Sequence, residues 1–178
     1  MHRLFVALSL PELVADGLSQ LQSGVDGARW RPVEAFHLTL QFIGDVDRHG
    51  LEEAASAVAG VTAPSFSLTL KGCGYFGGQK PQSLWAGVEA NPALDHLQAK
   101  IETALRRYAI TLENRKFAPH VTLAYVRAVS QESAERYCAG HGLFRLGPFP
   151  VRAFHLYESY LGGEGAHYEI VETIPLDP

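Results

Sequence analysis

The stretch His37-Leu38-Thr39-Leu40 recurs later in the chain as His120-Val121-Thr122-Leu123, and this recurrence organises the whole sequence. In both copies histidine and threonine stand two positions apart, with an aliphatic residue after each. Side chains two positions apart on a β-strand point to the same face of the sheet. Each copy therefore predicts a strand that presents one imidazole and one hydroxyl to a common surface, while its aliphatic side chains enter the core.

The same order of elements surrounds both copies. Each half is predicted to run strand, helix, strand, helix, strand, and a proline opens the first helix of each half. The two motif histidines lie 83 positions apart (120 − 37), and the two prolines, Pro11 and Pro92, lie 81 apart (92 − 11). This steady offset predicts two similar lobes related by a pseudo-twofold axis, because the repeats of solenoids are shorter. The expected strands are 4–10, 36–44, 65–75, 83–89, 120–126, 149–160 and 168–174, and the expected helices are those opening at 11 and 92 together with 51–59 and 131–139.

Apolar stripes support the two proline-led helices. The first helix is predicted to carry Leu13, Val14, Leu18 and Leu21 on one side. The second is predicted to carry Leu94, Leu97, Ile101 and Leu105 at helical spacing. Near the end of the chain, Gly162-Gly163-Glu164-Gly165 predicts a turn before the last strand.

These elements predict an α+β fold. We expect two pseudo-twofold-related lobes, each a mainly antiparallel sheet with helices on the outside, facing a central cleft. The lobes form a single domain over residues 1–178, with halves at approximately 1–78 and 79–178. The short stretch Gly77-Gly78-Gln79-Lys80-Pro81 is the best junction between them.

Composition restricts the class of protein. The chain has 178 residues, 47% of them hydrophobic, which is typical of a soluble globular domain. It lacks the roughly 20 consecutive apolar residues that a membrane span needs, and its short apolar start runs directly into Pro11-Glu12 without a cleavage site. We expect a cytoplasmic protein with no membrane partner. Cys73 and Cys138 are too few for a disulfide framework.

The net charge of −4 argues against a protein that follows a nucleic-acid duplex, because such proteins usually carry a basic face. If the chain handles nucleic acid, it is expected to hold a terminus or a short oligomer.

Two imidazoles and two hydroxyls in one small volume suit in-line displacement at phosphorus. A neutral imidazole deprotonates the attacking water, and a protonated imidazole gives its proton to the leaving oxygen. Threonine hydroxyls donate to the non-bridging oxygens. We assign His37 as general acid and His120 as general base, with Thr39 and Thr122 on the phosphate, although a pseudo-symmetric site permits the opposite assignment. One His-x-Thr alone would mean little, but two at equivalent points of a duplication favour a functional role.

A metal site is not expected. His155 with Tyr157, or His167 with Glu169, would share a strand face, but neither pair completes a set of three ligands. The glycine-rich stretches lack the lysine of a phosphate-binding loop and are interpreted as turns. The sequence therefore predicts neither a metal nor another cofactor.

Beyond these patterns, the chain resembles the two-histidine (2H) phosphoesterase superfamily, and within it the bacterial and archaeal RNA 2′,3′-cyclic phosphodiesterases, also called 2′-5′ RNA ligases. The resemblance implies a two-lobed α+β fold, no metal, and opening of terminal 2′,3′-cyclic phosphates to 2′-phosphomonoesters. Besides the two motifs, it rests on Arg3-Leu4-Phe5-Val6-Ala7-Leu8, Ala28-Arg29-Trp30, Phe42-Ile43-Gly44, Leu84-Trp85-Ala86-Gly87-Val88, Phe117-Ala118-Pro119 and Leu156-Tyr157-Glu158-Ser159.

The chain departs from the family at two positions. Gln41 stands where a basic residue usually follows the first motif, and Tyr125 stands where an arginine usually follows the second. Arg127, on the same nominal strand face as Tyr125, is a candidate replacement for that arginine as a phosphate contact.

Further substrate contacts are open to two interpretations. Arg115 and Lys116 precede the second motif and either guide an RNA 3′ end or belong to a solvated loop. Phe42 and Tyr125 either stack on a terminal base or pack in the core.

The sequence therefore predicts a hydrolase that opens RNA 2′,3′-cyclic phosphates without metal, acting on RNA 3′ ends or short oligonucleotides. Reversible 2′-5′ joining would use the same site in the opposite direction. The alternative from another class is a non-catalytic module that binds nucleotides or RNA ends.

Overall fold

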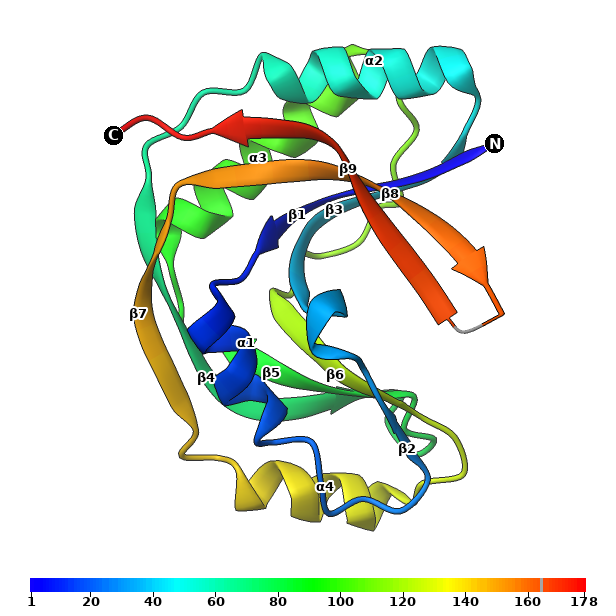
Figure 1. The fold of residues 1–178 in the computed structure, drawn as a ribbon, viewed down its shortest axis with the longest axis vertical. Coiled ribbons are helices and arrows are strands. Elements are labelled where there is room, and N and C mark those ends of the chain that lie inside the picture. The colour runs from blue at the N-terminus through cyan, green and yellow to red at the C-terminus, as the bar shows by residue number, and fades with distance from the viewer. Residues whose placement is uncertain (164) are drawn as a thin grey trace.

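A computed structural model describes residues 1–163 and 165–178 of the chain, and it has two antiparallel β-sheets with helices on their outer faces (Figure 1). In Figure 1 one sheet lies above the other, with α2 above the upper sheet, α3 running behind β8 and β9, and α4 below the lower sheet. This arrangement confirms the α+β fold with two facing lobes. The upper sheet, sheet A, has the order β3-β1-β8-β9: His37–Val46, His2–Ser9, Ala153–Gly162 and Gly165–Pro175. The lower sheet, sheet B, has the order β2-β6-β5-β4-β7: Ala28–Trp30, His120–Val126, Ser83–Val88, Phe66–Phe76 and Arg145–Val151.

Three helices begin within one residue of their predicted starts, whereas α2 begins at Arg48 instead of 51, because Asp47 caps it by accepting from the N–H of Gly50 at 2.8 Å. The long helix α3 follows Asn91, whose side-chain oxygen accepts from the backbone N–H groups of Ala93 (3.1 Å) and Leu94 (3.2 Å), and Pro92 occupies its first turn. Its predicted apolar stripe is buried throughout. The helices are α1 (Glu12–Ser19), α2 (Arg48–Ala59), α3 (Pro92–Arg107) and α4 (Gln131–Gly140), with a 3₁₀ turn, η1, at Val33–Ala35.

The structure differs from the first predicted apolar stripe at Leu13. Val14, Leu18 and Leu21 are buried as expected, but the Leu13 side chain is 83% exposed. The helix is only eight residues long and packs against β7 through a narrow face, so the residue beside Val14 remains in solvent. No helix in the described ranges combines the length and apolar content that a membrane span requires.

The order of elements repeats as predicted, but the sheets do not follow the expected halves 1–78 and 79–178. In each sheet the motif strand, β3 or β6, pairs with the first strand of its own half, β1 or β5. The first strand of each half also pairs with the third strand of the other half. β1 pairs with β8 from the second half, and β5 pairs with β4 from the first. The exchange of third strands ties the two lobes together.

The single strand expected at 149–160 is wrong, because this stretch belongs to two strands in different sheets. β7 ends at Val151 in sheet B and β8 begins at Ala153 in sheet A, so the chain crosses between the sheets at Arg152. Phe149 and Val151 before the crossing and Phe154 after it are buried, although Pro150 and Arg152 are exposed, so apolar residues on both sides of the crossing favoured a single strand. The expected turn at 162–165 includes Glu164, which lies outside the described residues.

Phe154 lies on β8 just after this crossing, and its side chain is fully buried in the core, so its contribution to stability tests this packing. We expect Phe154→Ala to lower the free energy of unfolding by about 3–5 kcal/mol, since it removes a large ring and leaves a cavity. Urea unfolding followed by circular dichroism measures the change. Leu143→Ala is the control, because Leu143 is fully exposed and should change stability by less than about 0.5 kcal/mol. A Phe154→Ala loss as small as the control's would contradict this packing.

Candidate active site

The two motifs lie on β3 and β6, which approach each other between the sheets. Their burial alternates as predicted: Leu38, Leu40, Val121 and Leu123 are buried, while each histidine and threonine is half-buried. All four polar side chains line one cavity of about 530 Å³. The fold therefore brings together His37, Thr39, His120 and Thr122.

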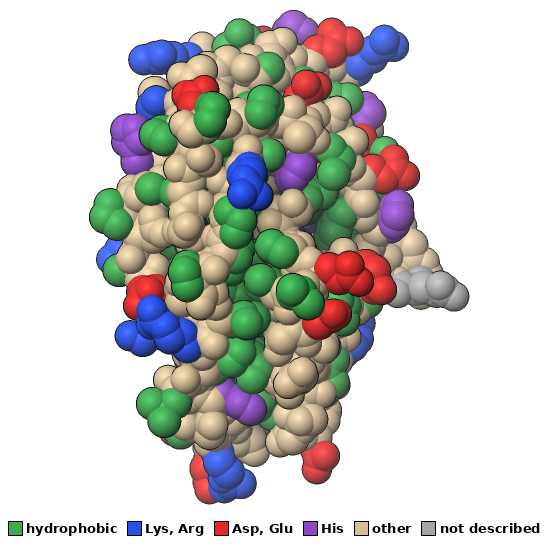
Figure 2. Space-filling model, turned by 60° about the vertical axis from the view of Figure 1, so that its left-hand side comes forward, with side chains coloured by type: hydrophobic (Ala, Val, Ile, Leu, Met, Phe, Trp, Pro, Cys, Tyr) green, Lys and Arg blue, Asp and Glu red, His purple; other side chains and the backbone are tan. Residues whose placement is uncertain are grey.

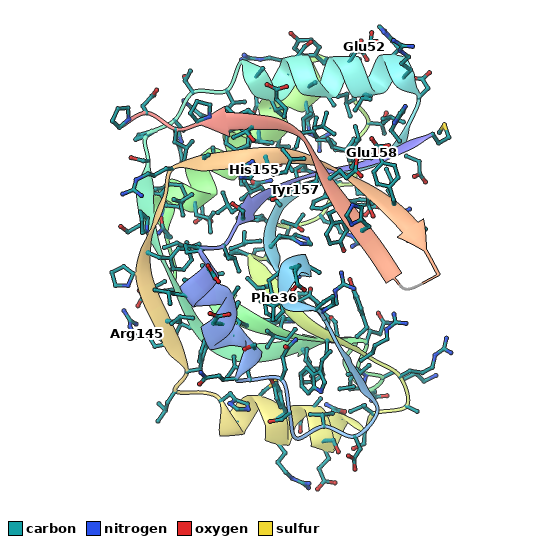
Figure 3. All side chains as sticks on the ribbon, viewed as in Figure 1. Phe36, Glu52, Arg145, His155, Tyr157 and Glu158 are labelled. Atoms are coloured by element: carbon teal, nitrogen blue, oxygen red, sulfur yellow. The ribbon has the colours of Figure 1, made fainter. Side chains whose placement is uncertain are left out.

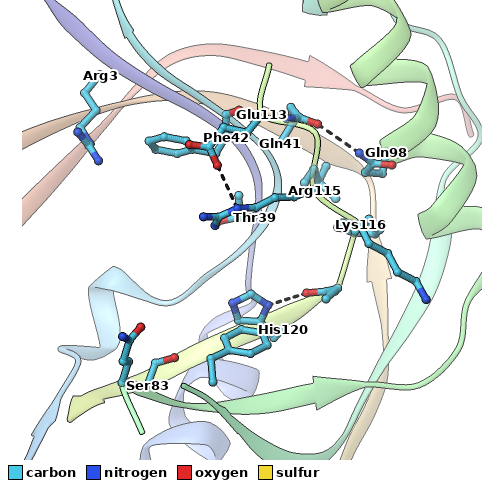
Figure 4. A pocket seen from close by; sticks show the side chains of 15 residues that line it. Arg3, Thr39, Gln41, Phe42, Ser83, Gln98, Glu113, Arg115, Lys116 and His120 are labelled. Carbon is cyan, nitrogen blue, oxygen red and sulfur yellow. Dashed lines mark hydrogen bonds and ion pairs between the residues drawn. The ribbon is translucent and has the colours of Figure 1, made fainter. Parts of the chain in front are cut away.

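Both imidazoles are held by the same backbone contact. Nδ1 of His37 donates to the carbonyl oxygen of Ala35 at 2.9 Å, and Nδ1 of His120 donates to that of Ala118 at 2.6 Å (Figure 4). A carbonyl oxygen only accepts, so Nδ1 carries the proton in the neutral ring. Nε2 is then the nitrogen available to accept a proton or, when the ring is charged, to donate one.

Aromatic rings surround His37. Its ring centroid lies 4.9 Å from that of Phe5 and 5.1 Å from that of Tyr168. Tyr157 stacks on Phe5 at 5.1 Å and lies 6.4 Å from His37, and Figure 3 shows it on β8 close to His155. Burial in this apolar setting lowers the pKa of His37 to about 4, and the nearby charge of Arg31 acts in the same direction.

His120 has a different environment. Its ring meets Phe76 edge-on at 4.9 Å and lies 5.8 Å from Trp85. The Trp85 ring packs so closely on Gly74 that a Cβ atom there would come within 2.2 Å of it. Burial lowers the pKa of His120 as well, while the bond to Ala118 opposes the shift. Among residues 1–163 and 165–178 no carboxylate forms an ion pair with either ring, whereas Nδ1 of His2 lies 2.7 Å from Glu158.

A second cavity, of about 790 Å³, adjoins the first on the side of α3 (Figure 4). The two cavities share Thr39, Phe42, Phe76, Arg115 and His120, among others. The larger cavity lacks His37 and Thr122, so the four motif side chains converge only in the smaller one. The larger cavity is therefore a lateral extension of the site.

The other predicted substrate contacts differ in which of the two cavities they line. Phe42 and Arg115 line both cavities, Tyr125 lines the smaller one, and Lys116 lines the larger one. Arg127 is exposed and lines neither cavity, so its expected role beside the phosphate stays a prediction that this geometry does not support. It follows the last residue of β6, where the strand alternation that placed it beside Tyr125 no longer holds. Gln41 faces α3, where it accepts from Gln98 at 3.3 Å.

Several lining residues were not predicted from the sequence: Arg3, Phe5, Arg31, Phe76 and Tyr168. Arg3 and Phe5 lie two positions apart on one face of β1, but Leu4–Leu8 are all buried, so the continuous apolar run carries no alternation that could have identified them. Phe76 ends β4 just before a glycine pair, and nothing in the local pattern distinguishes it. Arg31 and Tyr168 reach the site only through strand pairing.

The smaller cavity is cationic, although the chain carries a net charge of −4. Its described lining includes Arg3, Arg31 and Arg115 and contains no carboxylate. On the outer face seen in Figure 2, charged side chains of both signs are scattered and mixed. Positive charge inside a cleft concentrates anions there, so the site is suited to a phosphate-bearing ligand.

Metal ligands do not converge in the described ranges, where no three His, Cys, Asp or Glu side chains could hold an ion together. His155 is instead bonded to neighbouring hydroxyls, with Ser9 at 3.1 Å and Thr173 at 3.0 Å. Cys73 and Cys138 are free thiols whose pKa values burial raises.

Fold and site together define a two-sheet α+β protein with a duplicated His-x-Thr motif in its cleft. The chain belongs to the 2′-5′ RNA ligase superfamily, whose family model matches residues 10–163. It is 34% identical over 132 residues to the RNA 2′,3′-cyclic phosphodiesterase of Thermotoga maritima, covering 70% of each chain. It is 29% identical over 172 residues to the enzyme of that name from Archaeoglobus fulgidus, covering 94% of this chain and 96% of the relative.

Solved structures confirm the fold. LigT of Escherichia coli in its apo form superposes with a TM-score of 0.82 at 22% identity, covering 99% of this chain and 98% of LigT. TT0787 of Thermus thermophilus superposes with a TM-score of 0.80 at 26% identity, covering 97% of both chains.

The aromatic surroundings of His37 generate a direct test. A histidine is neutral above its pKa, so His37 should stay neutral as the pH falls through 6 and take up a proton only near pH 4. Histidine ring resonances, assigned with a His37→Gln variant and followed by NMR from pH 3 to 8, measure this. Titration of His37 at or above its ordinary value of about 6.5 would contradict the buried, uncharged environment described here.

Proposed function

We propose that this chain is an RNA 2′,3′-cyclic phosphodiesterase that opens terminal cyclic phosphates to 2′-phosphomonoesters, with His37 and His120 as its acid–base pair. The observation that carries the proposal is the equivalent fixation of the two imidazoles in one cationic cavity, each with Nδ1 bound to a backbone carbonyl and Nε2 left for chemistry. The names of the relatives from Thermotoga and Archaeoglobus support the choice of substrate.

The reaction needs a base and an acid on opposite sides of phosphorus. One Nε2 takes a proton from water as the water oxygen bonds to phosphorus. The other Nε2 gives its proton to the ribose O3′ as the P–O3′ bond breaks, which leaves a 2′-phosphate. Placing one histidine on each of two facing sheets suits this in-line geometry. The proton removed at one histidine is restored from the other through solvent after product leaves.

Thr39 and Thr122 are proposed to donate to the non-bridging oxygens of the phosphate. Each threonine follows its histidine on the same strand face and lines the same cavity. Negative charge builds up on these oxygens in the transition state, where fixed donors have their largest effect.

The assignment of acid and base follows from the surroundings of each ring. The sequence suggested His37 as acid, but its low pKa in the free protein favours its neutral form. We therefore propose His37 as the base and His120 as the acid. A bound phosphate anion would raise both pKa values, because it stabilises an imidazolium beside it.

Ring opening by a 5′-hydroxyl in place of water forms a 5′-O–P bond as the P–O3′ bond breaks, which gives a 2′-5′ phosphodiester. We propose this joining, with its reverse, as a secondary activity of the same site. A non-catalytic module that binds RNA ends is the competing function. Catalysis needs the two free Nε2 atoms, whereas binding alone does not require a proton donor and a proton acceptor together.

Removing either imidazole separates catalysis from binding. We expect His37→Ala and His120→Ala each to lower kcat by roughly 10²–10⁴-fold, the usual effect of losing a positioned general acid or base. The double variant should lose far less than the product of the two, since the residues act as a unit. Hydrolysis of a nucleoside 2′,3′-cyclic phosphate measures kcat, and titration with the corresponding 2′-monophosphate measures affinity.

His49→Ala is the matched control for these variants, because His49 lies exposed on α2 and pairs with Glu53 rather than lining either cavity. It should leave kcat unchanged. If His37→Ala and His120→Ala keep full turnover, or lose affinity without losing kcat, the binding module is the better account.

Activity is also predicted to be independent of metal, since a complete acid–base pair requires no metal-bound water. Purified protein in excess EDTA should hydrolyse the cyclic phosphate at the rate found without chelator, and added Mg²⁺, Mn²⁺ or Zn²⁺ should not accelerate it. Loss of turnover in EDTA that Zn²⁺ or Mn²⁺ restores would contradict the two-histidine mechanism.

A further inference from the structure

Arg31 lies at the site through backbone pairing rather than through either motif. It follows β2, and its N–H donates to the carbonyl oxygen of Leu123 at 2.8 Å, which fixes it beside the second motif strand. Its side chain lines the 530 Å³ cavity together with His37 and His120. A positive charge therefore lies in the chamber where both imidazoles meet.

Two tyrosines hold the Arg31 side chain in place. Its Nη2 donates to the hydroxyl of Tyr168 at 2.8 Å. Its guanidinium carbon lies 5.3 Å from the ring centroid of Tyr125 and 5.9 Å from that of Tyr168. Cation–π contacts orient a guanidinium while leaving its charge intact. Ordering in the free protein reduces the entropy lost when a ligand binds.

The other two arginines of this cavity have acidic partners. Arg3 lies 3.6 Å from a carboxylate oxygen of Asp45, and Arg115 lies 3.0 Å from one of Glu113. For Arg31, no ion pair with a carboxylate occurs within residues 1–163 and 165–178, and its bound partner there is a neutral phenol. Of the three, Arg31 has the charge least compensated by the described residues.

Strand pairing also places Arg31 next to the position where the chain departs from its family. Tyr125 stands where an arginine usually follows the second motif, and it pairs across the β2–β6 ladder with Arg29, two residues before Arg31. The guanidinium over the Tyr125 ring therefore comes from the neighbouring strand. Arg127, the replacement suggested by sequence, is exposed and outside the cavity.

We propose that Arg31 binds a non-bridging oxygen of the cyclic phosphate, and that Tyr125 serves as the surface on which its guanidinium rests. This inference rests on the proposed function, because it takes the scissile phosphate as the ligand. A guanidinium is suited to the task, since it stays charged at all relevant pH values and presents several donors in one plane. Its position on the side of His37 also opposes protonation of that ring before substrate arrives.

Arg31→Met tests the proposal, because methionine keeps an unbranched stem and removes the charge. We expect kcat/KM for a nucleoside 2′,3′-cyclic phosphate to fall by roughly 10²-fold, as for loss of one donor to a developing oxyanion. The Kd of inorganic phosphate, measured by calorimetry, should rise roughly 10- to 100-fold, the scale of a hydrogen bond to a charged group. Inorganic phosphate is the chosen probe because it occupies only the position of the scissile group.

Arg29→Met is the matched control. Arg29 lies on β2, two residues before Arg31, and 6.0 Å from the centroid of the same Tyr125 ring, but it does not line the cavity, so both constants should stay unchanged. Adding Tyr125→Arg to Arg31→Met should recover most of the lost kcat/KM, because it restores a guanidinium to the chamber from β6. Urea unfolding midpoints of all variants show whether any effect reflects loss of structure.

The outcomes are distinct. An unchanged phosphate Kd in Arg31→Met overturns the proposal, as does a loss seen only with oligonucleotides, which would place Arg31 on a neighbouring phosphodiester. Equal losses of kcat/KM and phosphate affinity in Arg29→Met and Arg31→Met would also overturn it, because they would show a general effect of surface charge. A wild-type protein that hydrolyses no cyclic phosphate would refute the proposed function, while the calorimetric comparison would still decide whether Arg31 binds phosphate.

Discussion

Antiparallel pairing between β1 and β8 is the interaction on which the rest of the structure depends. It joins residues from opposite ends of the chain, setting Phe5 opposite Tyr157 and Ala7 opposite His155. With the matching pair β4–β5, it exchanges the third strands of the two halves and fixes one sheet against the other. Without that exchange each half would hold one histidine and half a cleft. The aromatic wall around His37 follows directly, because Tyr157 and Tyr168 come from β8 and β9.

The surroundings of the two imidazoles then determine the electrostatics of the site. The cavity carries arginines, and burial lowers the pKa of both histidines, so the cavity is suited to an anion. A phosphate entering it supplies the negative charge that makes one imidazolium favourable. Protonation of the acid and binding of the substrate are thereby coupled, which makes Arg31 more than an added contact. Arg31 is proposed to bind the anion, and its charge adds to the burial that lowers the pKa of His37.

The sequence predicted what depends on local periodicity. Alternation on β3 and β6 placed His37 and His120 on exposed faces, and the stripe of α3 identified buried positions that the structure confirms. What depends on long-range pairing was not predicted. The apolar residues on both sides of Arg152 gave no sign that the chain changes sheets there, and the three-residue strand β2 is too short to show a period. Arg31 was therefore not predicted as a site residue, whereas Arg127 was predicted from a strand alternation that ends before it.

The central claim is that one phosphorus atom is held between two imidazoles on facing sheets, and a crystal structure with a uridine–vanadate complex tests it most directly. Vanadate adopts the five-coordinate geometry of in-line displacement. Nε2 of His37 and Nε2 of His120 should each lie within about 2.6–3.2 Å of the two opposite apical oxygens. Vanadate bound against only one histidine, or outside the cavity that both of them line, would contradict the account.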